Sequence, residues 1–281
     1  MAGFFGLFNY EKEGPGISKN APKKKTFIVF FETFFRNFWK FIIINLVYCL
    51  ISLPVLTNGL ASAGITNVTR NIARDKHSFG VSDFMDTIKK NWKQVLPAGI
   101  INTIVYLLLV LNVGFYYNTT GIMGSIGLGI VLCMLFIFTV MNYYVWTLCI
   151  TFKFTLKQIY KNSFKFVFIN MKMNLLCFFV ILLIYAANIA IALLLLPYFY
   201  IVLTFELLLY VLLFPSFRFL LVQFCTFPSI KKYIIDPYYL EHPDEDIDKR
   251  HDLGIEVEKK PVEVPEGETP PEEEPENVFE D

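Results

Sequence analysis

The chain has 281 residues, of which 55% are hydrophobic and 17% aromatic, and its formal net charge at pH 7 is zero. This composition is typical of a multi-pass membrane protein and disfavours a soluble globular domain, which has too little interior to bury so many apolar runs. The zero net charge conceals a division, because residues 1–235 carry a net of +14 and residues 236–281 a net of −14.

The first 25 residues combine an aromatic cluster with a linker rich in glycine and proline and a triplet of lysines at residues 23–25. Glycine and proline disfavour a helix through this linker. Two interpretations are open. Either the lysines contact anionic lipid headgroups, or the aromatic cluster docks on the membrane body or on a partner. The candidate docking residues are Phe4, Phe5 and Phe8.

A membrane helix is predicted within residues 26–56, from about Phe34 to a break at Pro54. The next segment, residues 55–68, is short for a span, because about 20 apolar residues are needed to cross the hydrocarbon layer. It is also rich in small residues, which allow helices to approach closely. We therefore expect a short buried helix or a re-entrant segment here.

Lysine and arginine near the ends of spans favour the cytoplasmic side. Basic clusters occur in the N-terminal tail, in residues 70–93, in residues 153–172 and after the last predicted span. The connectors at residues 118–121 and around Pro197 carry no basic residue. Every basic cluster is cytoplasmic if residues 56–68 return through the membrane, so both termini are predicted to be cytoplasmic.

Residues 81–93 are predicted to form an amphipathic helix on the inner face of the membrane, with Ser82 as its N-cap. Two long helices are expected to follow, at residues 95–117 and about 122–152. The second exceeds the thickness of the hydrocarbon layer, so it must tilt or project.

Four lysines recur every four residues after this helix, interleaved with aromatic and aliphatic side chains. A four-residue step turns a helix by about 400°, so these lysines form a slowly drifting stripe on a helix that lies on the inner face. Basic and aromatic mixtures also bind nucleic acid, but membrane spans flank this one, and no nucleic-acid partner is expected. The stripe consists of Lys153, Lys157, Lys161 and Lys165.

Residues 174–222 contain only two residues that are charged at neutral pH, Glu206 and Arg218. The run is long enough for two membrane crossings with Pro197 between them, so a helical hairpin is predicted. Glu206 lies nine residues after Pro197, about 13 Å along a helix, and therefore near the middle of the membrane. Arg218 lies a further 18 Å or so along the helix. It is therefore not expected to pair with Glu206, and its side chain is expected to extend toward the inner surface.

Ionisable residues inside a membrane are costly and are often functional, which makes Glu206 the candidate intramembrane site. One interpretation is a protonated or hydrogen-bonded glutamate that fixes helix packing. The other is a proton or substrate site. The polar residues of other helices that are candidates to meet it are Asn102, Asn112, Tyr185 and Asn188.

The acidic, proline-rich residues 236–281 lack the apolar periodicity needed to bury a core, so they are predicted to be disordered. Near their end, Phe279 is either part of a tail without a role or a docking residue.

The sequence contains no recognisable signature of an enzyme. The three histidines are scattered in polar segments, and motifs for phosphate binding, dinucleotide binding and a nucleophile elbow are missing. The five cysteines lie in or beside apolar runs without the spacing of metal ligands, so they are expected to be buried apolar side chains. We therefore expect no catalytic residue, no cofactor and no metal.

These predictions combine into an all-α fold. The expected architecture is a polytopic membrane bundle of five long transmembrane helices plus one short or re-entrant helix, with amphipathic helices on its inner face. The predicted organisation is a cytoplasmic tail at residues 1–25, a membrane body at residues 26–235 and a disordered acidic cytoplasmic tail at residues 236–281.

Several stretches resemble the YesL-like family of bacterial membrane proteins. They are the opening GFFGLFNYEKEGPGISKNAPKKK, the segment LPVLTNGLASAG at residues 53–64, the stretch from RNIARDKHSF to KKNWKQ at residues 70–94, and the terminal VFED. The resemblance implies a multi-pass protein of the bacterial cytoplasmic membrane, often encoded beside genes for carbohydrate import and polysaccharide use. The family has no assigned molecular activity, so the resemblance implies no catalytic residue.

Two functional hypotheses follow. In the first, the protein is a non-enzymatic accessory or assembly component of oligosaccharide uptake. Its surroundings are the lipid bilayer, and its partners are subunits of a carbohydrate ABC importer. In the second, it is a small-solute or proton-coupled carrier, with Glu206 and the broken segment at residues 54–64 forming a midplane site. No inverted repeat is visible, which weakens the second hypothesis.

Overall fold

The structure is a computed structural model that describes residues 25–241, apart from the side chains of Leu196 and Phe199. Every element in this range is a helix, which confirms the all-α prediction. The chain divides into two compact units between Ser229 and Ile230, and the two are considered separately.

The first unit contains α1 (Thr26–Arg36), α2 (Phe38–Ser52), the 3-10 helix η2 (Val55–Thr57), α3 (Asn58–Ala73), α4 (Val81–Asn118), α5 (Ile122–Thr151), α6 (Leu156–Ile169), α7 (Met171–Leu194), the 3-10 helix η3 (Leu196–Tyr198), α8 (Phe199–Leu212) and α9 (Phe214–Ile230), whose last residue belongs to the second unit. The second unit continues with a π-helix, η4 (Lys231–Ile235), and α10 (Asp236–Glu241). The predicted start of the acidic tail at residue 236 therefore falls within a helical run. The rest of that tail lies outside the described residues.

Three helices, α4, α5 and α7, are each long and apolar enough to cross a membrane. Only 17%, 11% and 6% of their most apolar stretches are buried within the protein, so most of this apolar surface faces outward. Such surface is stable in hydrocarbon rather than in water. The number of candidate spans rises to five if each of two bent helix pairs counts as one span, so the prediction of five long spans depends on those pairs.

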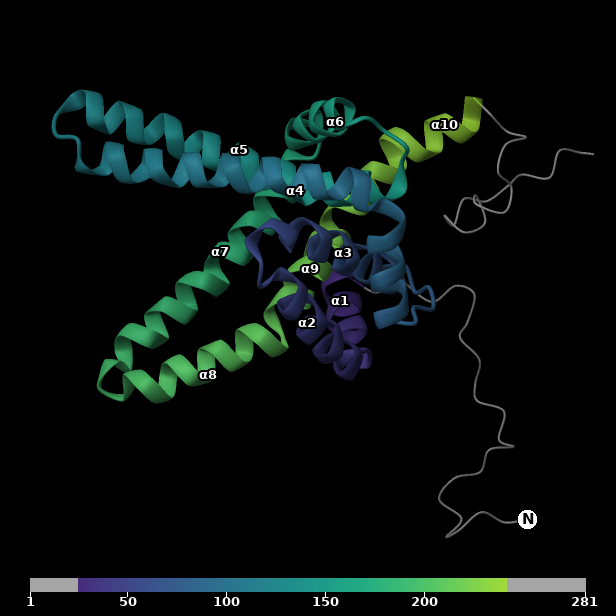
Figure 1. Cartoon of the computed structure of the whole chain (residues 1–281), viewed down its shortest axis with the longest axis horizontal. Coiled ribbons are helices and arrows are strands. Elements are labelled where there is room, and N and C mark those ends of the chain that lie inside the picture. Colours follow the sequence, from purple (N-terminus) through teal and green to yellow (C-terminus); the bar gives the residue numbers. More distant parts are fainter. Residues whose placement is uncertain (1–24, 242–281) are drawn as a thin grey trace, which may run out of the picture. The chain divides into compact units, whose positions relative to one another are not determined.

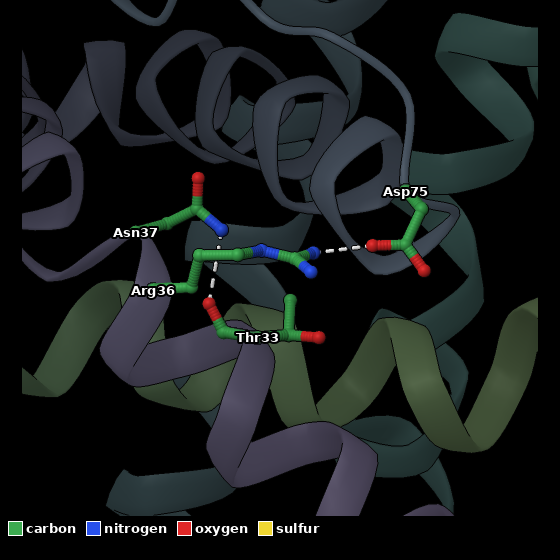
Figure 2. A network of polar contacts seen from close by, with 4 residues as sticks. All are labelled: Thr33, Arg36, Asn37 and Asp75. Carbon is green, nitrogen blue, oxygen red and sulfur yellow. Dashed lines mark hydrogen bonds and ion pairs between the residues drawn. The ribbon is translucent and has the colours of Figure 1, made fainter. Parts of the chain in front are cut away.

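The first bent pair is α1 and α2, which meet at 75°. Figure 2 shows the polar contacts at this bend. The side-chain amide of Asn37 donates to the carbonyl oxygen of Thr33 at 3.0 Å, and the guanidinium of Arg36 pairs with the carboxylate of Asp75, just after α3. An asparagine that bonds back to the preceding turn competes with continuation of the helix. The membrane helix predicted from about Phe34 therefore begins at Phe38, and the residues before the bend form the separate helix α1.

The second bend, of 47°, separates α8 from the helical run that begins at Phe214. Pro215 favours a helix start here, because it has no amide hydrogen for a bond to the preceding turn. Asn45 of α2 partners the backbone groups that the break frees. Its Nδ2 donates to the carbonyl oxygen of Leu212 at 2.7 Å, and its Oδ1 accepts from the amide of Ser216 at 2.8 Å. The second helix of the predicted hairpin is therefore broken rather than continuous.

Helix α3 lies inside the first unit, and ten of its 16 residues are buried. Its small residues allow close contact with α4. A Cβ atom added to Gly59 would lie 2.6 Å from the Cα of Gly99, and one added to Gly64 would lie 2.8 Å from the ring of Phe84. The expectation of a short buried helix is confirmed. At about 24 Å, α3 is shorter than the hydrocarbon layer is thick.

Helix α4 runs without interruption from Val81 to Asn118, through Pro97. The separate surface helix predicted at residues 81–93 is thus the first part of a longer helix. Phe84 holds this part of the helix against the bundle, because its fully buried ring packs on Gly64 of α3.

Figure 1 shows α4 and α5 running antiparallel and side by side. The connector turns at Gly121, whose φ of +88° is a conformation that glycine adopts without strain. Gly127 of α5 makes room for the ring of Tyr116 in α4, since an added Cβ would lie 2.3 Å from that ring. Close packing of α4 against α5 therefore favours glycine at position 127.

Candidate functional site

A cavity of about 640 Å³ lies between α7 and α8. The two helices meet at η3 and diverge from it (Figure 1). Most of the lining is aliphatic and aromatic, with contributions from α1 and α9. We call this space the Glu206 cavity. Its polar side chains are Tyr185, Asn188, Glu206 and Tyr210.

Glu206 is the electrostatically unusual group of this cavity. Its side chain is half-buried, and its Oε1 atom is fully buried without a hydrogen-bond partner among the described residues. A buried polar atom without a partner costs about 1–3 kcal/mol. The cavity therefore favours an occupant that donates a hydrogen bond to Glu206.

Two of the four predicted neighbours of Glu206 line its cavity. The amide of Asn188 donates to the carbonyl oxygen of Ile184 at 2.7 Å, and the ring of Tyr185 packs on that of Phe214 with centroids 4.8 Å apart. The other two predicted neighbours lie elsewhere. The amide of Asn112 donates within its own helix, and Asn102 belongs to a separate polar network.

That network joins α4, α5 and α6. The hydroxyl of Tyr160 donates to Oδ1 of Asn102 at 2.9 Å, and Nδ2 of Asn102 donates to Oδ1 of Asn142 at 2.7 Å. Burial raises the pKa of Tyr160, so its hydroxyl keeps the proton that it donates. A second anchor of α6 is Asn174, whose amide donates to the carbonyl oxygen of Phe166 at 2.9 Å.

These anchors leave the lysine stripe on the outer face of α6. All four predicted lysines are exposed, Lys153 just before the helix and the other three on it. Thr155 begins α6 with a capping box. Its Oγ1 accepts from the amide of Gln158, and its own amide donates to Oε1 of Gln158. Phe164 and Phe168 are exposed on the same helix, which gives it the mixed basic and aromatic surface of a helix at a membrane interface.

Arg218 occupies a place that the sequence did not predict. Instead of extending toward a membrane surface, it lines a pocket of about 110 Å³ enclosed by residues of α3, α4, α5, α7 and α9. We call this space the Arg218 pocket. Tyr185 lines both this pocket and the Glu206 cavity. Sequence spacing misses the Arg218 pocket, because five separate helices build it.

The predicted docking residues Phe4, Phe5, Phe8 and Phe279 lie outside the described residues. Within residues 25–241, no group of three or more His, Cys, Asp or Glu side chains is arranged to hold a metal ion. The five cysteines are free: Cys149, Cys177 and Cys225 are buried, Cys49 is half-buried and Cys133 is exposed.

The fold and its cavities define a helical membrane protein with three to five candidate spans. Residues 41–113 match the model of a family described as a protein of unknown function, DUF624. Comparisons with curated proteins and with solved structures gave no significant match. The matched residues run from α2 to most of α4 and include the contact of Gly59 with Gly99, whereas Glu206 and Arg218 lie beyond them.

Proposed function

We propose that the protein is a non-enzymatic accessory or assembly component of carbohydrate uptake in the bacterial cytoplasmic membrane. In this proposal the Glu206 cavity receives a transmembrane helix of a partner, such as a subunit of an oligosaccharide ABC importer. The observation that carries the proposal is the buried, unpartnered Oε1 of Glu206 in a mostly apolar cavity. A partner helix supplies both the apolar side chains that fill the cavity and one hydrogen-bond donor.

The surface beside the cavity supports this occupant. The most apolar stretch of α7 is only 6% buried, the lowest value among the three straight candidate spans. Leu193 and Leu207, which line the cavity, are 64% and 62% exposed. Lipid alone fills such a surface but offers no donor to a carboxylate at this depth. The carbohydrate system is suggested by the resemblance to the YesL-like family, on which the identity of the partner rests.

If a partner helix binds in the Glu206 cavity, substitutions of Glu206 are expected to weaken its binding to different degrees. Glu206→Leu removes the acceptor and is expected to weaken recovery of the partner roughly tenfold, as expected for loss of a hydrogen bond to a charged group. Glu206→Gln keeps an acceptor oxygen and is expected to retain most of the binding. The measurement is copurification of importer subunits in mild detergent from cells grown on the relevant glycan.

A photocrosslinking residue tests where the partner lies. At Leu203, in the cavity and 50% exposed, it is expected to form a crosslink to an importer subunit. At Ile104 of α4, which is 51% exposed, it is the matched control and is expected to label only lipid. Equal crosslinking at both positions, or recovery of no importer subunit, would contradict the proposal.

The proposed arrangement places both termini and α6 on the cytoplasmic side, where the lysine stripe meets anionic lipid. In a chain whose native cysteines have been replaced, Lys157→Cys is expected to react with a membrane-impermeant maleimide only after the cells are opened. Thr120→Cys, in the exposed connector between α4 and α5, is expected to react in intact cells. The reverse pattern would refute this sidedness.

The second candidate function is a small-solute or proton-coupled carrier. It is favoured by the volume of the Glu206 cavity and by Tyr185, which lines both this cavity and the Arg218 pocket. Here Glu206→Gln has the opposite consequence, because glutamine cannot release a proton, and uptake is expected to be abolished. Normal uptake with Glu206→Gln together with loss of partner binding in Glu206→Leu favours the accessory role over the carrier.

A further inference from the structure

We propose that the Arg218 pocket binds a small oxyanion, a carboxylate or a phosphate, inside the membrane part of the protein. This site is separate from the Glu206 cavity and does not depend on the proposed accessory function. Three properties of the pocket carry the inference: an unpaired cation, unused hydrogen-bond donors and a small volume.

The cation has no anionic partner in the described chain. The arginine side chain remains protonated in proteins, and a buried charge is stable only when it is paired or hydrogen-bonded. Within residues 25–241, no hydrogen bond or ion pair involves the guanidinium of Arg218. The acidic residue of α8, Glu206, lines the other cavity and does not pair with Arg218.

Neighbouring side chains compensate this charge only in part. The guanidinium lies 5.0 Å from the centroid of the Phe219 ring, a cation–π contact. Tyr106, Tyr143 and Tyr185 also line the pocket. Aromatic rings and neutral hydroxyls stabilise a cation but do not neutralise its charge. An anion in the pocket would stabilise Arg218 and also neutralise its charge.

The hydrogen-bonding groups that remain free include two donors. Tyr143 and Trp146 of α5 line the pocket. Neither the hydroxyl of Tyr143 nor the indole N–H of Trp146 makes a hydrogen bond within the described part of the chain. The side-chain oxygens of the two amides in the lining are already engaged. Oδ1 of Asn142 accepts from Asn102, and Gln223 exchanges hydrogen bonds with Thr147.

The unpaired charge and the free donors select the ligand class. A neutral sugar leaves the charge of Arg218 without an anionic partner, and a metal ion is repelled by Arg218. An oxyanion presents only acceptors, which match a guanidinium fork, an indole N–H and a phenol hydroxyl. The volume of about 110 Å³ corresponds to roughly four water molecules, enough for acetate or phosphate and too small for an oligosaccharide.

The test is equilibrium binding of radiolabelled acetate and of radiolabelled inorganic phosphate to the purified full chain in detergent. We expect saturable binding of at least one probe, and the two arms distinguish a carboxylate site from a phosphate site. Arg218→Gln is expected to weaken binding roughly tenfold or more, and Tyr143→Phe, which keeps the ring and removes only the hydroxyl, by several-fold. Lys165→Gln removes the same charge from the exposed face of α6 and is expected to leave binding unchanged.

The proposal is overturned if neither anion binds saturably, if a neutral hexose binds and both anions do not, or if Arg218→Gln binds as tightly as the unaltered chain. Should Arg218→Gln fail to fold, Tyr143→Phe decides. Weakened binding then supports the site, and unchanged binding overturns it.

Discussion

Leucine at position 99 is expected to prevent α3 and α4 from packing. An added Cβ at Gly99 would lie 2.8 Å from the Cα of Gly59, so the clash is with backbone, which cannot rotate away. The two helices must separate, and the buried face of α3 loses its contact with α4. Overpacked cores cost about 1–3 kcal/mol and occasionally more, and a backbone clash places Gly99→Leu at the upper end. The measurement is the midpoint of thermal unfolding in detergent together with the size-exclusion profile.

The matched control for this substitution is Gly114→Leu, on the same helix. A Cβ at Gly114 would meet no atom within 4 Å, so the added side chain extends into the lipid. Its midpoint is expected to equal or slightly exceed that of the unaltered chain, because leucine also favours a helix more than glycine does. If Gly99→Leu and Gly114→Leu unfold at the same temperature, the close contact of α3 with α4 is not present.

Asn45→Leu is expected to release the bend between α8 and α9. Asn45 is fully buried and is the hydrogen-bond partner of the Leu212 carbonyl and the Ser216 amide. Leucine has a similar size but leaves both backbone groups without these bonds. Each buried polar group that loses its partner costs about 1–3 kcal/mol, so for two groups we expect a loss of about 2–6 kcal/mol. The loss of stability is measured by thermal unfolding, and release of the bend by the rate of proteolysis near Leu213.

Asn112→Leu is the control for Asn45→Leu. The amide of Asn112 is exposed and donates only to the carbonyl oxygen of Leu108, four residues earlier in its own helix. That carbonyl already belongs to the helix ladder, so the loss is expected to be small. Unfolding midpoints that fall equally for the two variants would show that Asn45 does not hold the bend.

The bend also explains how Glu206 and Arg218 come to separate sites. On one straight helix, twelve residues place two side chains about 18 Å apart, which suggested that Arg218 reaches a membrane surface. The break after Leu212 redirects the chain, so that α8 presents Glu206 to one cavity and α9 presents Arg218 to another. Asn45→Leu is therefore expected to weaken any anion binding at Arg218 as well as stability.

The amino-acid sequence alone predicted a helical fold surrounded by lipid. Apolar runs such as that of α7 are too long and too numerous for a soluble interior, and this follows from length and composition alone. The small side chains in segment 55–68 likewise predicted a short buried helix. Close packing depends on side-chain size, and side-chain size is known directly from the sequence.

The positions of the helix bends and the pairs of polar groups that meet became visible only in the three-dimensional structure. The break at Leu213 depends on Asn45, 168 residues earlier, and the packing of the first part of α4 on the bundle depends on the contact of Phe84 with Gly64 of α3. The Arg218 pocket takes its walls from five helices. Periodicity describes one helix at a time, whereas a buried polar group is placed by the partners it must find, and those partners lie on other helices.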